Sequence, residues 1–237
     1  MKLLLLLLSA GKLGKLLTSG GTMLLSVLAY AFVYGWWYAL GFVALLFCHE
    51  MGHFLAARQR GLPVGLPTFI PFVGAWIEMK ELPKDVETEA YVGIAGPVAG
   101  TVAALACYAL AREFDSRLLL ALAYAGCFLN LFNLIPISPL DGGRITAILS
   151  PRLWLLGVPV LAAAFFWRPS PILILIVILA LPQLKAAWNW DPAAAGNQAY
   201  YAVSSEDKFT YGAFYVGLIV FLCLMVHGLH TELGPAR

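Results

Sequence analysis

The stretch Gly41-Phe-Val-Ala-Leu-Leu-Phe-Cys-His49-Glu50-Met-Gly-His53-Phe-Leu-Ala-Ala57 places three ionisable side chains inside an otherwise apolar run. Residues four apart lie on one face of an α-helix, so His49 and His53 are expected to present two imidazoles to a single Zn²⁺. Glu50 is then expected to act as the general base toward water at the metal. An apolar helix with this motif predicts a metal centre.

The composition of the whole chain places that helix in a membrane. Hydrophobic residues make up 61% of the 237 residues and charged residues only 12%, which leaves too little polar surface to cover a soluble globule. The apolar residues gather into runs of roughly 16 to 22, near the length that crosses ~30 Å of hydrocarbon. We therefore expect an all-α polytopic membrane protein. The formal charge of +2 gives no reason to expect a nucleic-acid partner.

Six to seven of these runs are predicted to be transmembrane helices. The doubtful pair lies in 152–187, where four prolines interrupt the apolar run and favour either two crossings or one kinked passage. Residues 1–237 are expected to form a single membrane-embedded domain, with the catalytic core in 19–150 and additional spans in 151–237. The predicted spans are 19–37, 39–60, 89–111, 117–136, 152–167, 170–187 and 209–229.

Two further segments are expected to associate with the membrane without crossing it. Residues 1–18 combine a leucine run with three lysines, which predicts an interfacial helix. Residues 66–80 are too polar and too proline-rich for a span, but β-forming residues flank Gly74. They predict a short membrane-associated β-hairpin between the second and third spans, whose edge strand pairs with an unwound substrate.

The distribution of basic residues predicts the orientation, because cytoplasmic segments of membrane proteins carry more Lys and Arg than external ones. With the N-terminus inside, eleven basic residues face the cytoplasm and four face outward. The inner ends of the second and fourth spans then share one depth. The inner residues are Lys2, Lys12, Lys15, Arg58, Arg60, Lys80, Lys84, Arg144, Arg152, Lys185 and Lys208, and the outer ones are Arg112, Arg117, Arg168 and Arg237.

A third metal ligand is expected because a catalytic zinc normally has three protein ligands and one open position. Asp141 lies at the inner end of the fourth predicted span, at the depth predicted for His49 and His53. Prolines end the helix before it and two glycines follow it, and glycine lets the backbone approach a ligand closely. The alternative is a plain loop leaving the membrane.

Asn133 precedes this turn within the same apolar segment. Its amide is able to donate a hydrogen bond to a substrate carbonyl or to the developing oxyanion. The alternative is an asparagine that caps a helix or bridges two helices.

Taken together, His49-Glu-Met-Gly-His53 and Asn133-x-x-Pro136-x-x-Pro139-Leu-Asp141-Gly-Gly resemble the site-2 protease family of intramembrane metalloproteases, in its compact form without a PDZ insertion. The resemblance implies one Zn²⁺ per chain held by His49, His53 and Asp141, with Glu50 as the catalytic glutamate. It also implies single-span membrane proteins as substrates, a regulatory membrane partner, and a prokaryotic inner membrane with the active site toward the cytoplasm.

A third similarity lies in Gly93-Ile-Ala-Gly96-Pro97-Val-Ala-Gly100, which resembles the Gly-Pro motif of the family's third span. Small residues there allow close helix contact. Relatives often carry Asn shortly after the proline, where this chain has Gly100.

A polytopic metal-ion transporter or channel is the alternative function, with the same residues as an ion site. Two features argue against it: the chain has no evident internal repeat, and Glu50 has a clear role only where water is activated.

Overall fold

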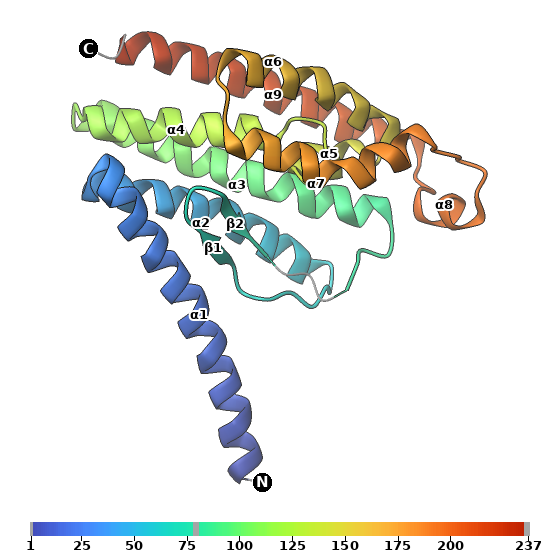
Figure 1. Ribbon diagram of the computed structural model, residues 1–237, viewed down its shortest axis with the longest axis horizontal. Helices are drawn as coiled ribbons and strands as arrows, with labels where there is room; N and C mark the ends of the chain where they lie inside the picture. The colour runs from blue at the N-terminus through green and yellow to red at the C-terminus, as the bar shows by residue number, and fades with distance from the viewer. Residues whose placement is uncertain (1, 78–80, 235–237) are drawn as a thin grey trace.

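The computed structural model describes residues 2–77 and 81–234 (Figure 1). Lys80, Arg237 and the last residues of the predicted hairpin segment, 78–80, lie outside the described residues. The elements in chain order are α1 (Lys2–Tyr34), α2 (Trp36–Gln59), β1 (Thr68–Ile70), β2 (Gly74–Trp76), α3 (Val86–Glu113), α4 (Arg117–Asn133), α5 (Asp141–Thr146), η1 (Pro151–Leu156), α6 (Gly157–Trp167), α7 (Pro171–Trp188), α8 (Ala195–Tyr200) and α9 (Ser205–Leu233).

Within the described residues, five helices are long and apolar enough to cross a membrane, which confirms the expected all-α polytopic membrane protein. The fourth predicted span, 117–136, ends three residues early in Arg117–Asn133, and the fifth, 152–167, corresponds to Pro151–Trp167; both are shorter than the five long helices. At 1.5 Å per residue, the 17 residues of α4 reach about 26 Å. The five long segments are Leu17–Tyr34, Trp36–Gln59, Val86–Glu113, Pro171–Trp188 and Ser205–Leu233.

The proline-rich region 152–187 folds into two antiparallel arms. The 3₁₀ helix η1 leads into α6, the chain turns at Arg168–Ser170, and α7 runs back beside α6 (Figure 1). The Ser170 hydroxyl accepts a hydrogen bond from the Ile172 N–H and so caps α7. Pro182 lies inside α7 without ending it. Only the prolines at the turn therefore divide the segment.

The N-terminal helix shows no boundary between the predicted interfacial segment and the first span. α1 runs unbroken from Lys2 to Tyr34. In Figure 1 it diverges from the helix bundle and meets it near its C-terminal end. There Val27 and Tyr30 pack against Ala39 and Val43 of α2. The interfacial placement of residues 1–18 stays a prediction.

The predicted β-hairpin is present between α2 and α3, where β1 pairs antiparallel with β2 and Phe69 lies opposite Ala75. Phe69 is only 2% exposed. The hydroxyl of Thr22 on α1 accepts a hydrogen bond from the Phe69 N–H at 3.2 Å, and the Tyr30 hydroxyl accepts one from the Phe72 N–H at 3.2 Å. Side chains of α1 therefore hold the outer edge of β1.

The centre of the molecule is a layer of α2, α3 and α4 (Figure 1). α9 packs across α4 through an apolar cluster that includes Ala123, Cys127, Tyr215 and Leu222. The short helix α5 packs against α3 and η1. The segment of α2 around His49 and His53 is thus enclosed by α3, α4 and α5.

Candidate metal centre

The two histidines and the glutamate of the α2 motif are almost completely buried. His49 is 3% exposed, Glu50 6% and His53 7%. The α2 helix has apolar side chains around it and packs most extensively on α3. Buried ionisable groups in a membrane helix are costly unless they are paired or coordinate a metal.

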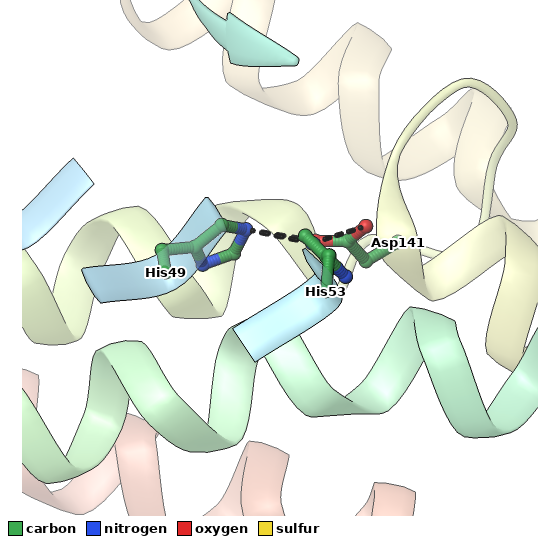
Figure 2. Close-up of side chains that lie close together, drawn as sticks. All are labelled: His49, His53 and Asp141. Atoms are coloured by element: carbon green, nitrogen blue, oxygen red, sulfur yellow. Dashed lines mark hydrogen bonds and ion pairs between the residues drawn. The ribbon is translucent and has the colours of Figure 1, made fainter. Parts of the chain in front are cut away.

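Asp141 completes this group from the other side (Figure 2). Its Oδ2 lies 3.1 Å from His49 Nε2, and its Oδ1 lies 3.2 Å from His53 Nε2. The two Nε2 atoms are themselves 3.2 Å apart. The ligand atoms of His49, His53 and Asp141 all lie within 4.8 Å of one another. The structure therefore brings together the three residues that the sequence predicted as metal ligands.

The hydrogen bonds of the outer ring nitrogens, the Nδ1 atoms, fix the tautomer and the orientation of both imidazoles. His53 Nδ1 donates to the backbone carbonyl oxygen of Val92 at 2.7 Å, and a carbonyl is only an acceptor. His49 Nδ1 donates to Asn130 Oδ1 at 2.8 Å. In the neutral rings both Nε2 lone pairs then face each other and a carboxylate. Three ligand atoms this close to one another are able to share one metal ion, so the donor set fits a single zinc site.

The position of Asp141 depends on a folded loop at the end of α4. The Tyr215 hydroxyl of α9 donates to Leu134 O at 2.6 Å, and the Trp154 indole N–H donates to Gly143 O at 2.7 Å. A Cβ on Gly142 would lie 2.2 Å from Leu134 O. The absence of a side chain at these glycines therefore lets the turn pack closely on the preceding loop, and the approach of a ligand to the turn stays a prediction.

Glu50 lies in the electrostatic field of the cluster. The titratable groups that interact with it are His53, His49 and Asp141, together with Arg144 of α5. The side chain predicted as general base is thus adjacent to the predicted ligands.

The two asparagines of α4 are placed differently. Asn133 is the last residue of the helix and is half-buried. Its predicted contact with substrate stays a prediction. Asn130 was not singled out from the sequence, yet it is 1% exposed and bonds His49. An amide within an apolar span was the signal that a polar partner lies opposite.

Comparisons with known proteins agree with this centre. The family model described as Peptidase family M50 matches residues 37–114, which include His49, Glu50 and His53 but not Asp141. A zinc metalloprotease of Methanocaldococcus jannaschii is 32% identical over 139 residues, covering 56% of this chain and 40% of that protein.

Two plant proteins are also similar. "Probable zinc metalloprotease EGY1, chloroplastic" of Arabidopsis thaliana is 28% identical over 153 residues, with 45% of this chain and 28% of that protein covered. "Probable zinc metalloprotease EGY2, chloroplastic" of Oryza sativa subsp. indica is 28% identical over 191 residues, with 57% and 34% covered. The chain spans less than half the length of these curated relatives.

Proposed function

We propose that the chain is a member of the site-2 protease family of zinc metalloproteases, and that it is a zinc-dependent endopeptidase that hydrolyses peptide bonds in or near transmembrane segments of other membrane proteins. The observation that carries the proposal is the convergence of His49, His53 and Asp141 from two distant parts of the chain, with Glu50 buried beside them.

The residues divide the chemistry between them. Zinc, when bound, supplies a Lewis acid that polarises a scissile carbonyl and lowers the pKa of water. His49, His53 and Asp141 hold the metal. Glu50 takes a proton from the attacking water and delivers it to the leaving nitrogen. Burial of the four side chains keeps bulk water out, which strengthens every charge interaction in the site.

The hairpin and the end of α4 bind the substrate in this proposal. A helix must unwind before it is cut, and an edge strand offers main-chain hydrogen bonds that tolerate any sequence. Strand β2 packs on α2, the helix that carries Glu50. Asn133 donates from its amide to the substrate carbonyl or the oxyanion.

The setting of the enzyme follows from its charges and its family. We place it in a prokaryotic inner membrane as a multi-pass protein, with the N-terminus and the active site toward the cytoplasm. Its substrates are single-span proteins of the same bilayer, and a regulatory membrane partner selects among them.

The test is cleavage of a model single-span protein in liposomes, together with zinc content. The parent chain is expected to bind about one zinc and to cut. Glu50→Gln keeps the size of the side chain and loses the base, so it should retain zinc while the rate falls by roughly 10²- to 10⁴-fold. Cutting by Glu50→Gln at the parent rate would disprove the assignment of the base.

The same liposomes separate the protease from the transporter or channel. Metal flux that depends on His49 and Asp141, with no cleavage by the parent chain, would replace the protease proposal with a transport function.

A further inference from the structure

The amide of Asn130 is enclosed in the interior of the molecule. Asn130 lies in α4, is 1% exposed, and donates from Nδ2 to the Gly126 carbonyl oxygen at 2.7 Å. Because that carbonyl only accepts, the donating Nδ2 is fixed on the side of Gly126 and Oδ1 is left free to accept. Within residues 2–77 and 81–234, the group that donates to this oxygen is His49 Nδ1, at 2.8 Å. Both ends of the amide are therefore used, one for its own helix and one for the metal ligand.

The opposite wall of this contact is α3, where Gly100 faces the amide. A Cβ on Gly100 would lie 2.3 Å from Asn130 Oδ1 and 2.8 Å from Nδ2. Real Cβ atoms do not approach other heavy atoms so closely, and the buried amide has no room to withdraw. Any side chain at position 100 therefore displaces the group that accepts from His49.

We propose that Asn130 is a positioning residue of the metal centre: its amide oxygen holds His49 with Nδ1 protonated and Nε2 aimed at the ion, and Gly100 provides the space for it. The inference rests on the zinc site of the proposed function. Outer partners of ligating histidines set the tautomer and ring orientation, and their loss typically costs about 10- to 100-fold in metal affinity.

The two histidines differ in whether a substitution is able to remove the hydrogen-bond partner of their outer ring nitrogen, Nδ1. The outer nitrogen of His53 donates to the backbone of Val92, which no substitution removes. The outer nitrogen of His49 donates to a side chain, that of Asn130, which a substitution does remove. A substitution at Asn130 should therefore weaken one of the three metal contacts and leave the fold of α2 intact.

The experiment measures the zinc affinity of the purified protein of residues 1–237 by competition with a chromophoric chelator. Asn130→Leu has similar volume and no acceptor, and we expect its zinc affinity to fall about 10- to 100-fold. The visible spectrum of the Co²⁺-loaded protein should change, which a purely structural role would not cause. Asn133→Leu, on the next turn of the same helix, is expected to keep the parent zinc affinity. Equal zinc affinities of Asn130→Leu and the parent would overturn the proposal.

An exchange variant keeps the test decisive if Asn130→Leu does not fold. In Gly100→Asn with Asn130→Gly, the new amide enters the same space from α3 and is able to accept from His49. We expect its zinc affinity to lie within a few-fold of the parent, and an affinity as low as that of Gly100→Asn alone would overturn the proposal.

Failure of the proposed function is a separate outcome. A parent chain that binds zinc and never cuts leaves the role of Asn130 intact, because affinity and the Co²⁺ spectrum do not depend on cleavage.

Discussion

His49 Nε2 on α2 lies 3.1 Å from Asp141 Oδ2 on α5, although 92 positions separate the two residues in the chain. The contact joins the C-terminal half of one long apolar helix to the first residue of the short helix α5. Neither residue is able to hold a metal alone. The fold brings these two side chains together, and their proximity makes α2 part of a candidate metal centre.

Substitution of Asp141 should abolish that centre. Asp141→Ala removes one of three ligands, and we expect zinc affinity to fall by more than the roughly 100-fold that loss of an outer partner costs. Cleavage should be lost with the metal. Chelator competition and cleavage in liposomes measure the two effects. Asp191→Ala, an exposed aspartate in the segment between α7 and α8, is the matched control. One zinc per chain in the Asp141→Ala protein at the parent affinity would exclude Asp141 as a ligand.

A single added methyl group on α3 should have a similar effect. A Cβ on Gly96 would lie 2.1 Å from His53 Nε2, the atom that faces the other two ligands. Gly96→Ala therefore must push His53 out of place, at a cost typical of overpacking of about 1–3 kcal/mol. We expect reduced thermal stability and reduced zinc content.

Gly217→Ala is the control for this variant, because nothing lies within 4 Å of the corresponding Cβ on α9. There alanine should leave zinc content unchanged and favour the helix by roughly 0.5–1 kcal/mol. Equal zinc content in the Gly96→Ala protein and the parent would contradict the close contact at His53.

The grouping of His49, His53 and Asp141 was predictable from the sequence. Helical periodicity places His49 and His53 on one face, and the need of a catalytic zinc for a third ligand at the same depth favours Asp141. The hairpin was predictable from β-forming residues around Gly74. The all-α class follows from composition alone.

The remaining features depend on what faces each helix across the bundle, which local patterns do not encode. Asn130 and Asn133 are three apart on α4, and only the position of α2 and Gly100 decides which of them bonds His49. Helix α4 ends earlier than predicted because the chain enters a loop there. The hydroxyl of Tyr215 on α9, far along the chain, donates a hydrogen bond to that loop. The unbroken α1 was missed because lysines after a leucine run indicate an interfacial segment as well as a continuing helix.

A tyrosine outside the spans should give the protein an alkaline instability. The Tyr200 hydroxyl donates to Glu89 Oε2 at 2.7 Å. Burial raises the pKa of Tyr200, and the Glu89 carboxylate raises it further. A pKa raised in the folded state means that the stabilisation is complete below the unfolded pKa of about 10 and is lost as pH rises through the folded pKa.

Tyr200→Phe should therefore lower the unfolding midpoint near neutral pH but reduce its fall between about pH 9 and pH 11. Denaturant unfolding at the two pH values measures this, with Tyr34→Phe as the control because Tyr34 is 59% exposed. Parallel loss of stability in the Tyr200→Phe protein and the parent would show that this pair does not control the alkaline limit.

The open edge of the hairpin is defined by which backbone groups point away from β1. The Phe69 N–H donates to Thr22 on α1, so Phe69 and Ala75 form a pair without mutual hydrogen bonds. In an antiparallel ladder the N–H and C=O of Ala75 then point outward. Ala75 is thus the residue of β2 that is free to pair with an unwound substrate.

Replacing Ala75 by proline removes that N–H without removing a hydrogen bond of the hairpin, and proline is tolerated on edge strands. If substrate pairs there, Ala75→Pro should lower kcat/KM about 2- to 10-fold, the effect of one main-chain hydrogen bond of roughly 0.5–1.5 kcal/mol. Zinc content should not change, because the metal ligands lie on α2 and α5. Ala75→Val keeps the N–H and should cut at a rate near that of the parent. Unchanged cleavage by a folded Ala75→Pro protein would exclude strand pairing at β2, and the substrate would then have to be held by other groups near Glu50.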